Sequence, residues 1–140
     1  MKEYAYPVRH YGAPTKRYCQ TLNLKNDPQL IETYRRLHSR EHVWKDIVAG
    51  IREVGILEME IYLYGCKLFM IVEVPADFDW DASMQRLAGL PRQAEWEALT
   101  ARYQDVGDGS ASSAEKWHLM ERIFHLYDEP ASASEAKEAE

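Results

Sequence analysis

The sequence predicts an α+β fold in which helices cover one face of an antiparallel sheet, and three observations lead to this prediction. Residues 27–55 carry apolar or aromatic side chains every three to four positions, which is the spacing of an amphipathic helix. Residues 56–64 alternate between apolar and polar side chains, and a second apolar run at 66–74 follows Gly65, as in a β-hairpin. Further helical spacing precedes a last strand-like run at 117–127. The resulting order βαββααβ, with a four-stranded antiparallel sheet and helices on one face, is the ferredoxin-like arrangement.

Composition and charge exclude several classes of protein. The chain has 140 residues, of which 46% are hydrophobic and 29% are charged, and this suits one domain with its own core. The net charge of −6 argues against a nucleic-acid binder, and no apolar run approaches the ~20 residues that a membrane span needs. The first residues are polar and rich in tyrosine, unlike a signal peptide, and Cys19 and Cys66 lack metal-like spacing. We therefore expect a cytoplasmic protein with reduced cysteines and no membrane or nucleic-acid partner.

Three regions are expected along the chain. Residues 1–15 contain Pro7, Gly12 and Pro14 without periodicity and are predicted to be an irregular N-terminal arm. The tyrosines of this arm favour packing on another part of the molecule, but a poorly ordered terminus is an equal alternative. Residues 16–128 form the domain, and residues 129–140 are a predicted disordered tail with nothing to bury.

The first strand is expected at 16–24, and the long helical stretch follows it. Asp27 can cap the first amides and Pro28 suits the first helical position, while Gly55 ends the stretch. A single helix over 27–55 would be ~42 Å long at 1.5 Å per residue, which is too long for a small domain. We therefore predict a break near Ser39 or Glu41, because Glu41 falls on the apolar face.

The strand at 56–64 predicts two different faces of the sheet. Alternate apolar residues point to the core, whereas Glu58, Glu60, Tyr62 and Tyr64 point to the opposite side. This polar and aromatic face suits pairing with a second subunit, which would give a homodimer of the α/β-barrel-like type; a solvated sheet face is the alternative.

Two shorter helices and a last strand complete the predicted fold. A helix is expected at 79–88, with Asp79 as its cap, and a second helix at 92–103 carries Trp96 at helical spacing. Residues 106–114 are rich in glycine and serine and are expected to form a loop before the strand at 117–127.

Tyr34 and His38 are the candidate reactive groups. They are four residues apart, so they share one helix face at the edge of the apolar stripe. An imidazole with a pKa near 6.5 can give or take a proton at neutral pH, and a nearby helix C-terminus is expected to favour its charged form. Taken alone, each residue is more often structural, as a capped helix histidine and a core tyrosine. His38 and His42 could together hold a metal, but no acidic third ligand is suitably placed, and we expect no metal.

Several segments together resemble a known family. They cover about residues 16–127, and the most telling part is the pair Tyr34 and His38 on the first helix, followed by Gly55 and a strand that contains Tyr62. The other matching segments are Trp44, Leu68-Phe69, Val72-Glu73-Val74, the helix with Trp96, and Glu121-Arg122-Ile123-Phe124-His125-Leu126. In these features the chain resembles the L-rhamnose mutarotase family and its relatives that act on L-fucose.

This resemblance implies a small dimeric isomerase that interconverts the α and β anomers of a 6-deoxy-hexose without a cofactor. His38 is similar to the family's proton-transfer histidine, Tyr34 to its tyrosine partner, and Trp96 to one of two adjacent tryptophans that wall the sugar pocket. Glu95 stands where the family has the other tryptophan, and there it could bind sugar hydroxyls; Met59 stands where the family has a pocket tyrosine. These departures favour L-fucose or a related sugar over L-rhamnose.

Two other functions are compatible with the same predicted fold. One is a cofactor-free, dimeric monooxygenase-like or sensor domain, which only analogy of fold supports. The other is a non-catalytic binding module that uses the sheet face with Tyr62 and Tyr64.

Overall fold

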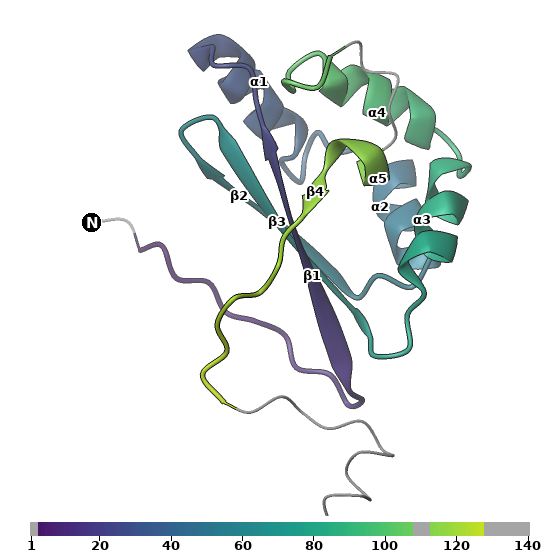
Figure 1. The fold of residues 1–140 in the computed structure, drawn as a ribbon. Coiled ribbons are helices and arrows are strands. Elements are labelled where there is room, and N and C mark those ends of the chain that lie inside the picture. Colours follow the sequence, from purple (N-terminus) through teal and green to yellow (C-terminus); the bar gives the residue numbers. More distant parts are fainter. Residues whose placement is uncertain (1–2, 108–112, 128–140) are drawn as a thin grey trace, which may run out of the picture.

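A four-stranded antiparallel sheet forms one layer of the molecule and the helices form the other (Figure 1). The computed structural model describes residues 3–107 and 113–127. The elements, in chain order, are β1 (Thr15–Asn23), α1 (Pro28–Leu37), α2 (Lys45–Glu53), β2 (Glu58–Tyr64), β3 (Lys67–Pro75), α3 (Trp80–Ala88), α4 (Gln93–Ala101), α5 (Ser113–Lys116) and β4 (His118–Leu119). The strand order β2-β3-β1-β4 confirms the predicted ferredoxin-like sheet.

The pairing of the strands fixes which side chains face the helices. β1 pairs with β3 from Thr15 opposite Pro75 to Asn23 opposite Lys67, and β2 pairs with β3 to complete the hairpin. Because side chains alternate along a strand, one face of the sheet carries apolar residues toward the helices. This face contributes Leu22, Leu68, Met70, Val72 and Val74 to the core.

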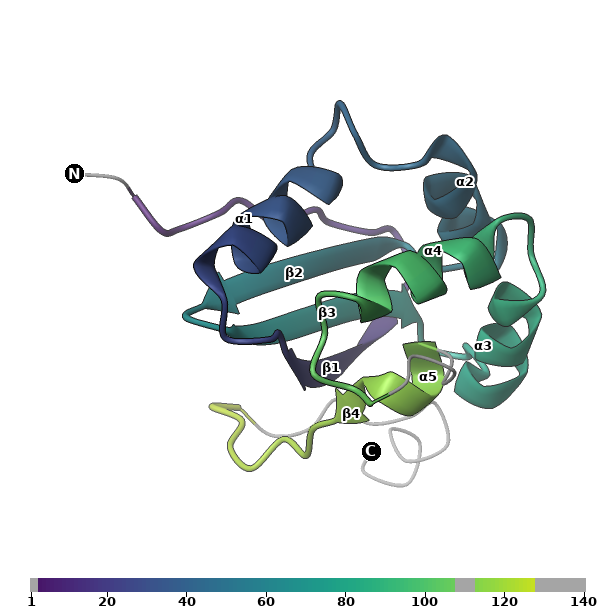
Figure 2. The same ribbon diagram turned by 90° about the horizontal axis from the view of Figure 1, so that it is seen from above.

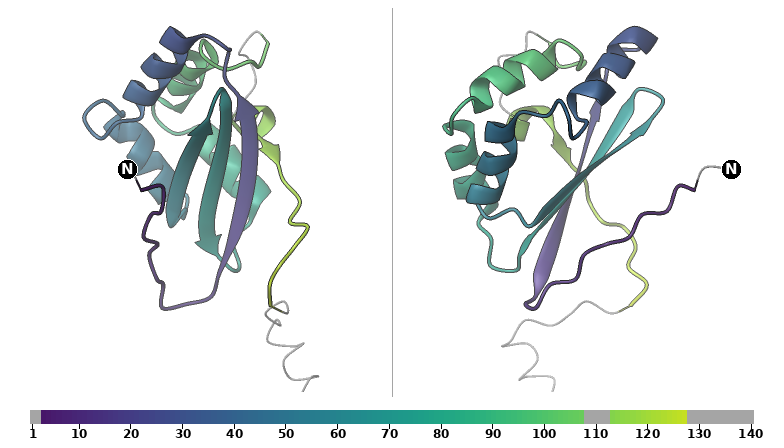
Figure 3. Two further views of the ribbon diagram at one scale, coloured as in Figure 1. Left: turned by 90° about the vertical axis from the view of Figure 1, so that its left-hand side faces the viewer. Right: turned by 180° about the vertical axis from the view of Figure 1, so that it is seen from behind.

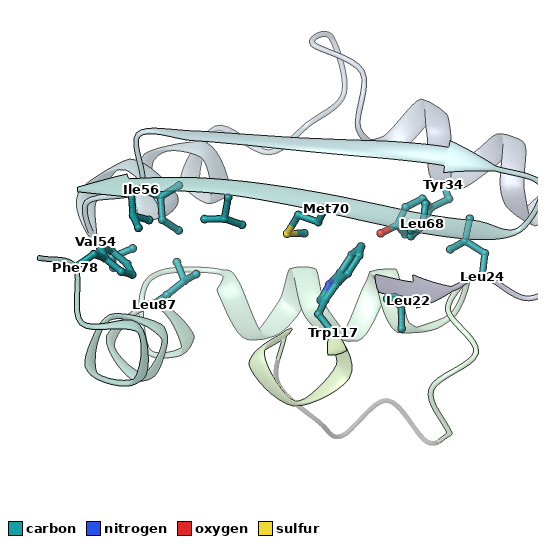
Figure 4. Packing of buried hydrophobic residues seen from close by; sticks show 12 residues of the cluster. Leu22, Leu24, Tyr34, Val54, Ile56, Leu68, Met70, Phe78, Leu87 and Trp117 are labelled. Atoms are coloured by element: carbon teal, nitrogen blue, oxygen red, sulfur yellow. The ribbon is translucent and has the colours of Figure 1, made fainter. Parts of the chain in front are cut away.

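The core lies between the sheet and the helix layer (Figure 4). Tyr34 from α1, Leu87 from α3 and Trp117 close this core from the helix side. Figure 2 shows α1 and α4 on the same side of the sheet, and the ring of His38 at the end of α1 contacts that of Trp96 in the middle of α4.

The predicted break in the first helical stretch is confirmed. The Asp27 carboxylate accepts hydrogen bonds from the amides of Gln29 and Leu30, so α1 begins where the sequence predicts. α1 ends at Leu37, and α2 begins at Lys45. Gly55 has a φ of 98°, a conformation that favours glycine, and it turns the chain from α2 toward β2.

The two helices after the hairpin also match the prediction. Asp79 accepts a hydrogen bond from the amide of Ala82 and thereby caps α3. α4 begins after Arg92, which has a left-handed φ of 64° although it carries a side chain. The sharp turn at Arg92 reverses the chain between α3 and α4.

The predicted last strand is wrong in length. Only His118 and Leu119 pair with β1, opposite Thr21 and Gln20. The amide of Met120 still donates to the carbonyl of Cys19, and the rest of the segment 120–127 then leaves this edge of β1 and continues outside the sheet. Helix α5 was not predicted; it occupies the end of the expected loop at 106–114, and part of that loop and the tail at 129–140 lie outside the described residues.

The second face of the sheet carries no helix (Figure 3). The N-terminal arm and the segment 120–127 both extend on this side (Figure 3, right). The ring of Tyr6 contacts that of Tyr62 edge-on, with 5.8 Å between their centroids, so the arm packs on the sheet there. Across 3–107 and 113–127, none of the helices combines the length and hydrophobicity that crossing a bilayer requires.

Candidate active site

His38 lies at the C-terminal end of α1, where the helix leaves a backbone carbonyl without a helical partner. Its Nδ1 atom is 2.8 Å from the carbonyl oxygen of Tyr34. A carbonyl oxygen can only accept, so the proton lies on Nδ1 in the neutral ring and the lone pair lies on Nε2. The carbonyl of Tyr34 thus fixes the tautomer in which Nε2 is a base.

Burial sets the protonation states of both candidate groups. Burial lowers the pKa of His38 below its ordinary value of 6.5, against the smaller opposing effect of the hydrogen bond to the Tyr34 carbonyl. The carbonyl at the helix end does favour the charged form, as expected, but desolvation outweighs this effect and the net shift of the pKa is downward. Burial also raises the pKa of Tyr34 to about 12, although the hydrogen bond from Gln104 acts in the opposite direction. At neutral pH the imidazole and the phenol are both uncharged.

The Tyr34 hydroxyl points into the layer between the sheet and the helices (Figure 4). Its oxygen accepts a hydrogen bond from Nε2 of Gln104 at 3.3 Å. Since the oxygen is the acceptor in this contact, its own proton is available for another group. The rings of Tyr34 and His38 are 4.4 Å apart between centroids, so the predicted pair does form one unit.

Trp96, which lies on α4, packs against the pair of Tyr34 and His38. Its ring meets that of His38 at 5.3 Å and that of Trp44 at 5.1 Å, and both contacts are edge-to-face. The guanidinium of Arg92 lies 4.0 Å above the ring of Trp44. Two tryptophans are therefore adjacent, although Trp44 comes from the segment between α1 and α2 rather than from a position next to Trp96 in the chain.

A cavity of about 410 Å³ lies between the sheet and helices α1 to α4, a size typical of small-molecule sites. Tyr34, His38 and Trp96 line it together, so the structure brings three of the four predicted site residues to one place. The rest of the wall is largely apolar and includes Met59, Ile61, Met70, Trp80, Met84 and Trp117. Its polar members include Gln20, Gln93, Thr100 and Gln104.

Glu95 is not brought to the cavity. It is exposed and lies 3.6 Å from Arg92 in an ion pair on the outer side of α4. The physical reason is helix phase, since Trp96 faces inward and its neighbour is turned about 100° away from it. The prediction that Glu95 binds substrate in this chain is therefore not supported by its position.

His38 and His42 do not face each other either. His42 is exposed, and its Nδ1 is 2.9 Å from the hydroxyl of Ser39. In the part of the chain that the structure describes, no three His, Cys, Asp or Glu side chains gather as a metal site would require.

The glutamines of the cavity were missed by the sequence analysis. Gln93 and Gln104 are eleven residues apart, which is three helical turns, and Glu97 and Thr100 lie between them on the same face. That spacing could have been read from the sequence, but polar residues on one helix face ordinarily indicate solvent.

Comparison with known proteins agrees with the resemblance seen in the sequence. Residues 17–126 match the family model described as L-rhamnose mutarotase. The chain is similar to the L-fucose mutarotase of Xanthomonas campestris pv. campestris, with 42% identity over 111 residues, 79% of this chain and 88% of that protein.

Two solved structures share the fold. The L-rhamnose mutarotase of Formosa agariphila superposes with a TM-score of 0.59 at 17% identity, covering 80% of this chain and 99% of that one. The tetracenomycin F2 cyclase of Streptomyces glaucescens, a type II polyketide cyclase, has a TM-score of 0.52 at 15% identity and covers 82% and 99%. The second match shows that the fold alone does not specify one reaction. The family model matches most of the chain, and the chain belongs to the L-rhamnose mutarotase family.

Proposed function

We propose that the protein is an isomerase that interconverts the α and β anomers of a 6-deoxy-hexose, and that L-fucose is its substrate. The family match supports a sugar mutarotase, and the 42% identical relative is named for L-fucose. The observation that carries the assignment of the site is the cavity in which a neutral imidazole, a phenol and a tryptophan meet.

His38 acts as the proton carrier in this proposal. Its Nε2 takes the proton from the anomeric hydroxyl while the bond between the anomeric carbon and the ring oxygen breaks. The imidazolium then gives the proton to the ring oxygen, which leaves an open-chain aldehyde. Both oxygens are bonded to the same carbon, so one imidazole can serve both. Rotation of the aldehyde and reversal of the steps yield the other anomer.

Tyr34 and Trp96 position the sugar. The Tyr34 phenol stays protonated at neutral pH and can donate a hydrogen bond to a sugar oxygen. The Trp96 ring provides a flat apolar surface for the C–H groups of the sugar, and the apolar wall with Met59 and Ile61 suits a methyl group in place of a hydroxymethyl.

NMR exchange spectroscopy between the two anomeric protons tests this function. Added protein should speed the exchange for L-fucose more than for L-rhamnose, and His38→Ala should reduce the acceleration roughly 10²–10⁴-fold. His42→Ala is the control, because His42 is exposed outside the cavity, and it should retain the wild-type rate. Equal exchange with and without wild-type protein for both sugars would exclude the proposal, and oxygen uptake would favour the monooxygenase-like alternative.

We also propose a homodimer formed through the open face of the sheet. This face carries Tyr62 and Phe69 at 6.4 Å between their ring centroids. The segment after β4 extends on the same side with exposed apolar side chains, namely Met120, Ile123, Phe124, Leu126 and Tyr127. A second copy related by a two-fold axis would cover both features at once.

A further inference from the structure

Helix α4 buries a polar face. Six polar or charged residues are buried in the described chain: Gln20, Gln93, Glu97, Thr100, Gln104 and Lys116. Three of them lie on α4, Gln104 follows it in the same phase, and the ammonium of Lys116 donates to the carbonyl of Glu97 at 3.1 Å. Four of the six line the cavity that holds His38. Buried polar groups reduce stability unless they are hydrogen-bonded, so this concentration at one cavity requires an explanation.

Two of these side chains each have an amide oxygen without a partner. Gln93 is 4% exposed, and its Nε2 donates to the carboxylate of Glu97 at 3.2 Å. This contact fixes the amide, because the reversed orientation would place two oxygens together. Gln104 is 2% exposed and donates its Nε2 to the Tyr34 hydroxyl. Within 3–107 and 113–127, these two Oε1 atoms are the buried side-chain polar atoms for which the protein provides no hydrogen bond.

We propose that Oε1 of Gln93 and Oε1 of Gln104 each accept a hydrogen bond from a hydroxyl group of the bound monosaccharide. A sugar hydroxyl is a donor of the right kind, because it can donate to an amide oxygen and still accept from another group. The ligand would thus supply the partners that the fold omits. This inference rests on the proposed function, and it names the residues that decide which hydroxyls the cavity requires.

The Gln104 amide also links sugar binding to the reactive pair. Its Nε2 donates a hydrogen bond to the hydroxyl oxygen of Tyr34, and the backbone carbonyl of Tyr34 accepts one from Nδ1 of His38. A sugar hydroxyl bound to Oε1 of Gln104 therefore lies beside the phenol, and the phenol lies beside the imidazole. Gln93 is one helical turn before Trp96 on α4, so its amide binds a different part of the same sugar.

Methionine variants test the two amides. Gln93→Met and Gln104→Met keep the length of the side chain and remove its polar end, and each should raise KM for L-fucose about tenfold. Thermal stability should fall modestly, because each variant also removes the Nε2 that donates to the Glu97 carboxylate or to the Tyr34 hydroxyl. Gln85→Met is the matched control, because Gln85 is exposed on α3, and it should leave KM unchanged.

Deoxy derivatives of L-fucose, each lacking one ring hydroxyl, separate binding from a structural role. For each amide, one derivative lacks the hydroxyl that donates to its Oε1. The kcat/KM of wild-type protein should be about tenfold lower for that derivative than for L-fucose, because the Oε1 then stays without a donor. The corresponding methionine variant should no longer distinguish this derivative from L-fucose. A merely structural glutamine would not affect one hydroxyl selectively.

The outcomes distinguish this inference from the proposed function. If wild-type protein speeds the exchange of L-fucose but treats all the derivatives alike, the assignment of the amides is wrong and the mutarotase activity stands. If the variants keep the discrimination of the wild type, the assignment is also wrong. If wild-type protein speeds the anomeric exchange of neither L-fucose nor any other 6-deoxy-hexose, the proposed function itself fails.

Discussion

His38 combines two contacts that act on its pKa in opposite directions. Burial among Tyr34 and Trp96 lowers the pKa, and the hydrogen bond to the Tyr34 carbonyl raises it by a smaller amount. The net result is a neutral base at physiological pH whose free lone pair is on Nε2. A proton carrier needs this state, because a ring that is already charged cannot take the anomeric proton.

We predict that kcat/KM falls as the pH drops below 6.5. The acidic side of the plot of kcat/KM against pH should follow the lowered pKa of His38 in the free enzyme. From about pH 7 upward kcat/KM should be constant until another group titrates. The measurement is the anomeric exchange rate as a function of pH at low sugar concentration. A limb with an apparent pKa above 6.5 would contradict the neutral state of His38.

The same shift makes a prediction about stability. In the unfolded chain His38 takes up a proton near its ordinary pKa of about 6.5, whereas in the folded protein it does so only at lower pH. The unfolded state therefore binds more protons below pH 6.5, and the free energy of unfolding decreases there. His38→Gln should flatten this decrease in urea titrations between pH 7 and 5, and the control His42→Gln should not. Identical slopes in wild type and His38→Gln would contradict the prediction.

The residues of the site differ in how well the sequence could predict them. Tyr34 and His38 were predictable because a spacing of four within one helix fixes a shared face. Trp96 could be identified as a site residue only through the family resemblance. The same resemblance suggested Glu95, but the phase of α4 turns this side chain outward, where it pairs with Arg92. Trp44 joins Trp96 across a chain reversal, and no local pattern encodes that contact.

At the scale of elements, local signals predicted where helices begin and end. Asp27 and Asp79 act as caps, and the polar Glu41 on an apolar stripe marked the break between α1 and α2. The hairpin followed from strict alternation around Gly65. The last strand failed because its apolar residues suit a strand, but whether a strand forms depends on a neighbouring edge, which is not a local property.

Gly55→Ala should destabilise the junction between α2 and β2. The methyl group would have space, since its nearest neighbour is a ring atom of Phe78 at 3.7 Å, but the φ of 98° is unfavourable for any L side chain. We expect a loss of about 1–2 kcal/mol in the free energy of unfolding, measured by urea denaturation. Gly89→Ala is the control, because Gly89 ends α3 with a φ of −94° that alanine adopts readily, and it should not destabilise. Equal losses in the two variants would show that the backbone at Gly55 is not the cause.

At the scale of the whole molecule, the two faces of the sheet are covered by different parts of the chain. One face is closed by helices and encloses the cavity, while the other carries two extended segments that leave the body of the chain (Figures 1 and 3). Ile123 is 89% exposed and Phe124 is 75% exposed, in a segment with only two residues paired to the sheet. Single exposed apolar residues are ordinary, but five of them among the eight residues 120–127 are typical of a surface that a partner covers.

If a second copy covers these segments, a charge placed there should separate the copies. Phe124→Glu would bury an unpaired carboxylate in the interface, and the dissociation constant of the dimer should rise roughly tenfold or more. Sedimentation velocity over a concentration series should give twice the mass of one chain for wild type and a shift toward the single chain for the variant. Ala49→Glu adds the same charge at an exposed position of α2 in the helix layer, so it should sediment as wild type does. A wild-type protein with the mass of one chain at every concentration would rule out the homodimer, and the exposed segment would then need another partner.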